Sequence, residues 1–264
     1  MELDIAGYVA VVTDVDSGIG FCVAKQLSAE GVKVVLTGQH EDAMAHAASR
    51  IDRANVWHHR ADVTMTDVVE SLARAVKAHF GAPQILVHCA GITGATGPFH
   101  DLSDDDWRLA HDVIFMGAVR VVRAFAAAMV EQGWGRIVLT GSEDALQPYA
   151  DELPYCAAKA GILNLAKGLS KTYARNGVLV NTVSPAFIAT PMTDATLKKR
   201  AKNKNLSFGA ALDSFLDEQR PTLELHRRGL PEEVAATMVY LYSQHANFIN
   251  GANVRVDGGS VATI

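Results

Sequence analysis

The sequence has few cysteines, no excess of positive charge and no long apolar run, and each absence excludes a class of protein. Only 3 of its 264 residues are cysteines, too few and too widely spaced for a disulfide framework or for the paired ligands of a structural zinc site. The 24 basic residues are outnumbered by 29 acidic ones, so no overall positive field attracts nucleic acid. We therefore expect a protein of a reducing compartment that binds neither nucleic acid nor a structural metal.

Membrane and export signals are missing as well. The sequence contains no run of about 18 consecutive apolar residues, the minimum for a spanning helix. Its first residues, MELDIAGYVAVVTD, are acidic where a secretory signal is basic. These features predict a cytoplasmic protein that does not enter a membrane. What the chain does have is 49% hydrophobic residues, enough for a large core.

Short β-branched runs alternate with amphipathic segments along the whole chain, which is the pattern of βαβ units that build a parallel sheet. Strands are predicted at residues 8–13, 33–37, 56–60, 85–88, 136–140, 179–183 and 253–256, and helices at 19–30, 41–51, 65–80, 107–132, 155–176 and 231–242. No linker or internal repeat divides this series. We predict one doubly wound, Rossmann-like α/β domain over residues 1–264, with a seven-stranded, mostly parallel sheet.

The alternation breaks once, at about residues 190–229, which have helical composition but no predicted strand. Ligands of open α/β sheets bind beyond the carboxyl ends of the strands, so an insertion there is placed to cover the site. We predict a substrate lid. Its tract LKKRAKNKN, residues 197–205, has two interpretations: a solvated helix face, or a surface that attracts an anionic substrate.

Several motifs that carry chemistry follow one another along the chain. A glycine-bearing turn at residues 13–20 separates the first strand from its helix, where backbone N–H groups can approach a pyrophosphate. Further along are HCAG at 88–91, Tyr155-x-x-x-Lys159 with Ser142 thirteen residues before the tyrosine, NTVSPAFIAT at 181–190 and VDGG at 256–259. With these motifs in this order over almost its whole length, the chain resembles the short-chain dehydrogenase/reductase family.

The Tyr155–Lys159 pair has a physical rationale of its own. Residues i and i+4 of a helix share a face, so the Lys159 ammonium is expected beside a phenol whose ordinary pKa of about 10 makes it a poor acid at neutral pH. The resemblance implies that Tyr155 is the acid/base, that Lys159 also holds the nicotinamide ribose, and that Ser142 polarises the substrate carbonyl. It implies an NAD(P)-dependent oxidoreductase that interconverts a secondary alcohol and a ketone on a small-molecule substrate.

The resemblance also implies where the cofactor binds and how the chain assembles. The cofactor contacts it implies are Thr13, Ser17, Gly18, Ile19, Gly20, Gln39, Asp62, Val63, Ala90, Gly91, Tyr155, Lys159, Pro185, Ile188 and Thr190. Relatives of this kind pair two long helices, so a homo-oligomer, a tetramer or a dimer, is expected.

The phosphate loop departs from the family's pattern. Asp14 replaces its first glycine, and Asp16 adds a second carboxylate. Asp14 either caps the turn or repels the cofactor phosphates by on the order of 3 kcal/mol before solvent screening. Residues 37–40, TGQH, offer neither an acid for a ribose hydroxyl nor an arginine for a 2′-phosphate, so the cofactor is NAD or NADP.

A second group of departures concerns proton transfer. Ile114 occupies the position of an asparagine that holds a relay water in many relatives, and its side chain cannot hydrogen-bond. His111 or Asp112 could take over, or both are residues of the helix surface. Because the Ser–Tyr–Lys set is intact, we favour a divergent enzyme. A dinucleotide sensor, an oligomeric scaffold, and a lyase or isomerase without net redox change stay open.

Overall fold

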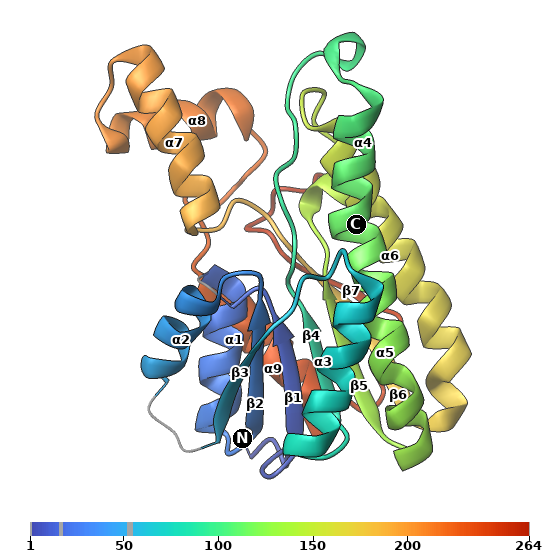
Figure 1. The fold of residues 1–264 in the computed structure, drawn as a ribbon. Coiled ribbons are helices and arrows are strands. Elements are labelled where there is room, and N and C mark those ends of the chain that lie inside the picture. The colour runs from blue at the N-terminus through green and yellow to red at the C-terminus, as the bar shows by residue number, and fades with distance from the viewer. Residues whose placement is uncertain (1, 16–17, 52–54, 264) are drawn as a thin grey trace.

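Buried β-branched side chains form the centre of the structure, a computed structural model that describes residues 2–15, 18–51 and 55–263. The strands are β1 Val9–Thr13, β2 Lys33–Gly38, β3 Val56–Arg60, β4 Ile85–His88, β5 Gly135–Thr140, β6 Val178–Pro185 and β7 Asn253–Val256. They form one sheet in the order β3-β2-β1-β4-β5-β6-β7, and every pairing is parallel (Figure 1). The predicted α/β class is confirmed, and the predicted strand ends lie within two residues of the observed ones.

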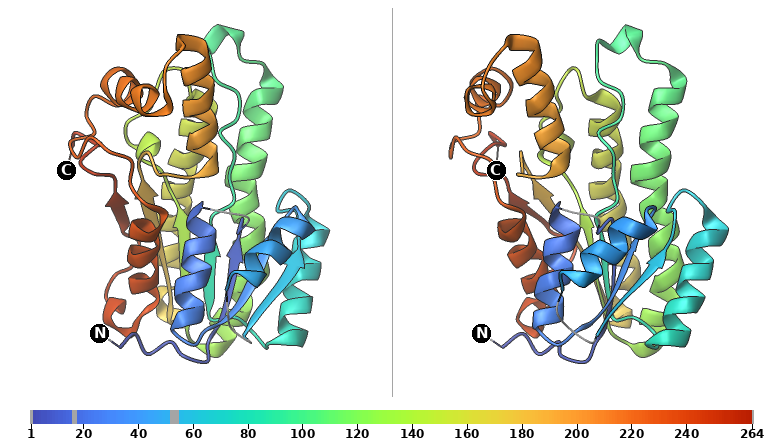
Figure 2. Two further views of the ribbon diagram at one scale, coloured as in Figure 1. Left: turned by 90° about the vertical axis from the view of Figure 1, so that its left-hand side faces the viewer. Right: turned by 60° about the vertical axis from the view of Figure 1, so that its left-hand side comes forward.

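Helices cover both faces of this sheet (Figure 2). They are α1 Gly18–Ala29, α2 Glu41–Ser49, α3 Thr66–His79, α4 Asp104–Ala110, α5 Gly117–Gln132, α6 Leu153–Tyr173 and α9 Pro231–Tyr242. On β1, Ala10 and Val12 pack with α1, α2 and α9, whereas Val9 and Val11 pack with α3, α5 and α6. Alternating side chains of one strand therefore enter two separate hydrophobic layers.

The helix predicted at residues 107–132 is interrupted. A π-helical segment, His111–Met116, separates α4 from α5. Residues 104–132 are long and apolar enough to cross a membrane by length and composition alone, but α5 buries one face against the sheet and α3. The spacing of apolar residues predicted the helix. It did not predict the wider π turn, because the apolar residues keep a helical spacing through that turn.

The insertion after β6 consists of two helices, α7 Pro191–Lys204 and α8 Phe208–Gln219, which project beyond the carboxyl ends of the strands (Figure 1). Thr190 caps α7 by accepting a hydrogen bond from the Thr193 amide, and proline stands at its first position. Arg200 of α7 binds Ser214 Oγ at 2.7 Å and Glu218 Oε2 at 2.6 Å on α8. The basic tract thus contributes a cross-link between the two helices.

Candidate active site

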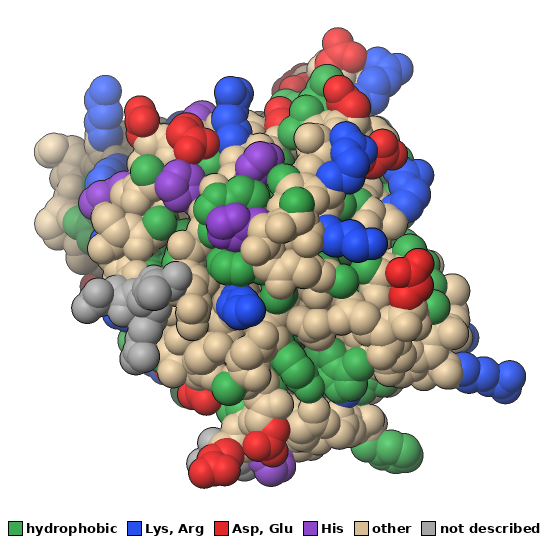
Figure 3. Space-filling view, turned by 60° about the horizontal axis from the view of Figure 1, so that its bottom comes forward, with side chains coloured by type: hydrophobic (Ala, Val, Ile, Leu, Met, Phe, Trp, Pro, Cys, Tyr) green, Lys and Arg blue, Asp and Glu red, His purple; other side chains and the backbone are tan. Residues whose placement is uncertain are grey.

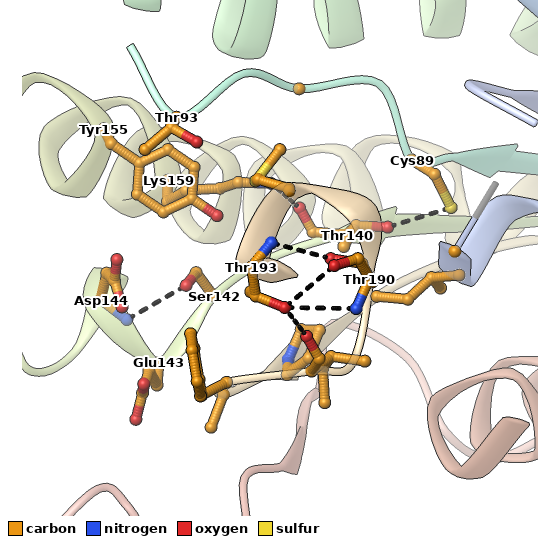
Figure 4. Close-up of a pocket in the computed structure, with 18 of the residues that line it drawn as sticks. Cys89, Thr93, Thr140, Ser142, Glu143, Asp144, Tyr155, Lys159, Thr190 and Thr193 are labelled. Carbon is orange, nitrogen blue, oxygen red and sulfur yellow. Dashed lines mark hydrogen bonds between the residues drawn. The ribbon is translucent and has the colours of Figure 1, made fainter. Parts of the chain in front are cut away.

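Ser142, Tyr155 and Lys159 come together at the carboxyl edge of the sheet (Figure 4). Ser142 follows β5, and its Oγ accepts a hydrogen bond of 3.3 Å from the Asp144 amide. Tyr155 and Lys159 are one turn apart on α6, with the lysine Nζ 5.6 Å from the centre of the tyrosine ring. Lys159 Nζ also donates to the Thr140 carbonyl at 2.8 Å. All three side chains line one cavity of about 260 Å³, below α7 and α8.

Burial dominates the titration of this group. It lowers the pKa of Lys159 to about 8, because the charged ammonium is removed from water. Burial also raises the pKa of Tyr155, and the Asp144 carboxylate raises it further, while the Ser142 hydroxyl opposes them. The environment of Tyr155 in this structure therefore favours the phenol, in contrast to the lowered pKa expected from Lys159 alone. The main physical reason is burial of the phenol, to which the Asp144 carboxylate adds, whereas Lys159 lies beside the aromatic ring.

The predicted cofactor contacts line two adjoining cavities. Gly18, Ile19, Gly20, Pro185, Ile188 and Thr190 line the catalytic cavity, and Thr13, Gln39, Val63 and Ala90 line a second one of about 210 Å³. Gly91 and Asp14 line both, so the two cavities form one groove along the carboxyl edge. Ser17 and Asp16 lie outside the described residues. Asp62 lines neither cavity; its Oδ1 accepts from the amide and the hydroxyl of Thr64, as a turn-capping residue does.

The start of α1 fits a dinucleotide phosphate. Gly18 has φ +69°, a left-handed conformation that favours glycine. A Cβ at Gly20 would lie 2.4 Å from the Asp14 carbonyl oxygen, so only glycine fits where this helix meets β1. Gly18 and Gly20 thus present no side chain of their own to the groove at the start of α1, where the helix dipole favours an anion.

Asp14 is the feature of this turn that does not match a phosphate site. It has φ +59°, the conformation that glycine adopts without cost, and its amide donates to the Thr37 carbonyl at 2.8 Å. Its side chain is exposed to the groove, and its charge acts on both Lys159 and Cys89. Asp14 thus stands where the two cavities adjoin.

A basic residue that the sequence did not single out lies beside Gln39, which lines the second cavity. Arg60 ends β3 and is paired in register with Gly38 of β2, and its Nε donates to the Gln39 carbonyl at 3.0 Å. The expected place for a base, residues 37–40, lies at the end of β2 and just after it, whereas Arg60 belongs to the neighbouring strand β3. Strand register could have revealed Arg60, because adjacent parallel strands end at the same edge.

The candidates for the proton relay all lie within the π-helical segment. Ile114 is buried, whereas Asp112 binds Arg120 Nη2 at 2.6 Å and His111 stacks on Phe115, 4.9 Å between ring centres. Neither residue lines the catalytic cavity, so their surface interpretation fits the structure better. His88 is buried with Nδ1 3.3 Å from Thr13 Oγ1, and burial lowers its pKa to about 3, so it is neutral.

Four charged residues of the catalytic cavity were not predicted at all. They are Glu143, Asp144, Glu152 and Arg220, which line it together with Ser142 and Tyr155. Glu143 and Asp144 directly follow Ser142 in the sequence, and their position after a strand end was the available signal. Arg220 follows α8 and reaches this place only through the fold of the insertion.

Known proteins resemble this chain over its full length. The family model described as Enoyl-(Acyl carrier protein) reductase matches residues 15–261. The uncharacterized oxidoreductase YvaG of Bacillus subtilis (strain 168) is 31% identical and covers 100% of both chains. The meso-2,3-butanediol dehydrogenase of Serratia marcescens is 32% identical over 97% of this chain and 95% of its own. The crystal structure of L-sorbose reductase from Gluconobacter frateurii, complexed with NADPH and L-sorbose, has a TM-score of 0.93 and 31% identity, with 100% of both chains covered.

Proposed function

Because the chain belongs to the short-chain dehydrogenase/reductase family of NAD(P)-dependent oxidoreductases, we propose that it interconverts a secondary alcohol and a ketone with Tyr155 as the acid/base. The observation that carries this proposal is the convergence of Ser142, Tyr155 and Lys159 in one cavity. That cavity continues into the glycine-bordered groove at the start of α1. A ketone oxygen that reaches Ser142 is then within reach of a proton donor and lies next to a place for a dinucleotide.

The residues of the chain divide the work of carbonyl reduction. Ser142 Oγ donates a hydrogen bond to the carbonyl oxygen, which polarises the bond. The Tyr155 hydroxyl transfers its proton to that oxygen as negative charge develops there. Lys159, anchored on the Thr140 carbonyl, keeps a positive charge beside the phenolate that remains. The nicotinamide, when bound, supplies the hydride to the carbonyl carbon.

The lid and the cofactor contacts are part of the same proposal. Gly18, Gly20 and Gly91 would border the pyrophosphate, and Lys159 would hold the adjacent ribose. The helices α7 and α8 would cover the substrate, since Met192, Thr193 and Phe215 line the cavity from that side; this supports residues 190–229 as a lid within a single domain.

The cofactor we infer is NADP(H). The Arg60 guanidinium lies at the end of β2, and residues 37–40 provide no carboxylate to repel a 2′-phosphate there. A guanidinium binds phosphate oxygens in a bidentate manner, so it favours the phosphorylated ribose.

A substitution on α6 tests the catalytic assignment. Tyr155→Phe removes the transferable proton, so kcat with any accepted ketone should fall by about 10² to 10⁴. Nicotinamide absorbance measures turnover, and Tyr173→Phe, a second hydroxyl deletion on the same helix, is the matched control. Full turnover by the Tyr155→Phe protein refutes the assignment. Cofactor binding without turnover of any ketone or alcohol would instead favour a sensor.

A further inference from the structure

One side of the catalytic cavity is formed by charged residues, which we name the acidic wall: Glu143, Asp144, Glu152 and Arg220. Glu143 is 2% exposed, Asp144 5% and Arg220 6%. Charged side chains are almost never buried to this degree unless they are paired or serve a ligand. Apolar side chains, among them Phe187, Met192 and Phe215, line the same cavity, and the Arg220 guanidinium carbon lies 5.3 Å from the centre of the Phe215 ring, so one substrate meets both polar and apolar chemistry.

The pairing within the acidic wall is incomplete. Arg220 Nε lies 3.5 Å from Glu143 Oε1 and Nη2 lies 3.5 Å from Glu152 Oε2, while the guanidinium carbon is 3.5 Å from the centre of the Tyr149 ring. One cation thus faces three carboxyl groups. Among the described residues, Glu143 Oε2 and Arg220 Nε have no hydrogen-bond partner. Both atoms are closed off from solvent, so they show that pairing within the acidic wall is incomplete, which costs stability.

Two of the carboxyl groups retain protons more readily than free ones. Burial raises the pKa of Asp144 and of Glu152. Repulsion by Glu143 raises the pKa of Asp144 further, repulsion by Asp144 raises that of Glu152, and Arg220 opposes both shifts. Such a pair offers a donor O–H as well as acceptor oxygens near neutral pH. A hydroxyl group, which both donates and accepts, is the complementary partner.

The acidic wall begins directly beside the carbonyl position. Ser142 Oγ accepts from the Asp144 amide at 3.3 Å, and Asp144 acts electrostatically on Tyr155 (Figure 4). A substrate whose carbonyl oxygen meets Ser142 and Tyr155 therefore places the group on the neighbouring carbon against Asp144 and Glu152.

We propose that the acidic wall binds a hydroxyl group next to the reacting carbonyl, so that the substrates are uncharged α-hydroxyketones and the vicinal diols or polyols derived from them. This inference rests on the proposed alcohol–ketone function. A keto acid gains little, because Glu143 and Glu152 already engage Arg220 and burial of an added charge is costly, and an ammonium group is repelled by Arg220 and Lys159. A plain ketone offers no hydrogen-bond partner to Asp144 and Glu152, and a polar site rejects an analogue that lacks the hydroxyl in this way.

A matched set of four-carbon methyl ketones tests this proposal. The probes are 3-hydroxy-2-butanone, 2-butanone and acetoacetate, assayed with saturating NADPH. For the wild type we expect kcat/KM for the hydroxyketone to exceed that for 2-butanone by about tenfold to hundredfold, the value of one hydrogen bond to a charged group. Acetoacetate should be the poorest substrate. In Asp144→Asn and Glu152→Gln the ratio of hydroxyketone to 2-butanone should fall toward one, mainly through KM of the hydroxyketone.

The ratio of the two substrates cancels any general effect of these variants on Tyr155. The control is Asp151→Asn, which removes an exposed charge from the same loop and should keep the ratio. A wild type that prefers 2-butanone or acetoacetate, or a ratio unchanged in both amide variants, overturns the proposal.

A binding measurement separates this proposal from the proposed function. NMR titration of the Tyr155→Phe holoprotein with 3-hydroxy-2-butanone and 2-butanone reports affinity without turnover. Selective binding of the hydroxyketone, together with no turnover of any ketone by the wild type, refutes the oxidoreductase function and supports the acidic wall as a hydroxyl site. Turnover of ketones without selectivity for the hydroxyketone refutes only the proposal that the acidic wall binds a hydroxyl group. If the hydroxyketone shows no selective binding and no ketone is turned over, both proposals are refuted.

Discussion

At the scale of single residues, one helix turn and one strand end bring Ser142, Tyr155 and Lys159 into the same cavity. Tyr155 and Lys159 share a face of α6 because they are four residues apart, and Ser142 follows β5, as predicted. Arg220 could not be found this way, because its place beside Glu143 depends on the path of α7 and α8. Residue spacing therefore predicts which side chains are neighbours within one helix or strand. It does not predict contacts made by residues of the insertion, because those depend on the tertiary fold.

The loop residue Asp14 gives the first prediction. Asp14→Gly should tighten NADPH binding about tenfold, because it removes a carboxylate from the groove and allows φ +59° without strain. Asp14→Asn keeps the size of the side chain and removes its charge, so it should recover most of that gain. Fluorescence titration of NADPH measures the three dissociation constants. Equal constants in all three proteins would show that Asp14 only shapes the turn.

Burial of Glu152 gives a pH prediction. Because burial raises the pKa of Glu152 and of Asp144, the folded protein holds protons that the unfolded chain has released, so this pair lowers stability as pH rises from about 5 to about 8. Glu152→Gln should therefore be more stable than the wild type at pH 8, by on the order of 1 kcal/mol, with a smaller difference at pH 5. Urea unfolding measures both values.

The comparison with the variant isolates the carboxyl pair from other titrating groups. His88 acts in the opposite direction, since its lowered pKa makes stability rise with pH between about 3 and 6.5, but it does so equally in both proteins. Glu70→Gln, which changes an exposed carboxyl group of α3, is the control and should follow the wild type. A Glu152→Gln protein whose advantage is the same at pH 5 and pH 8 would contradict the prediction.

At the scale of elements, hydrophobic periodicity predicted the strands and most helices, because each element buries a defined stripe of apolar side chains. It did not predict the π-helical segment His111–Met116, whose buried residues Val113 and Ile114 keep the same apolar face. Nor did it give the strand order, which requires knowing that β3 lies beside β2 and β4 beside β1.

The register of β2 and β3 yields the prediction for cofactor choice. Arg60→Gln should raise KM for NADPH by about tenfold or more and leave KM for NADH nearly unchanged, because only the 2′-phosphate loses a charged partner. Initial rates with both cofactors measure the ratio. Arg74→Gln, an exposed arginine of α3, is the control for net charge. Equal effects on both cofactors would mean that Arg60 only supports the Gln39 backbone.

At the scale of the whole molecule, the position of charges matters more than their sum. Acidic and basic side chains lie scattered on the face shown in Figure 3, and no large patch of one sign gathers there. The basic tract of the lid is partly neutralised, because Arg200 and Lys204 both bind Glu218 at 2.6 to 2.8 Å. The single domain and the homo-oligomer expected from the sequence stay predictions.

The cations of the lid therefore fall into two groups: Arg200 and Lys204, which bind Glu218, and Lys198 and Lys199, which could attract an anionic substrate. Arg200→Ala removes the link from α7 to Ser214 and Glu218, so the lid loosens and KM for the ketone should rise severalfold with faster hydrogen exchange in α7 and α8.

For Lys198 and Lys199 the solvated-face interpretation predicts that alanine substitutions change kcat/KM less than about twofold, since an uncharged ketone feels no steering field. With saturating NADPH, raising the salt concentration from 50 to 500 mM should likewise change kcat/KM by no more than about twofold. A steep fall of kcat/KM with salt that disappears in Lys198→Ala and Lys199→Ala would instead show that the lid attracts an anionic substrate. That result would also contradict the proposal that the substrate is uncharged.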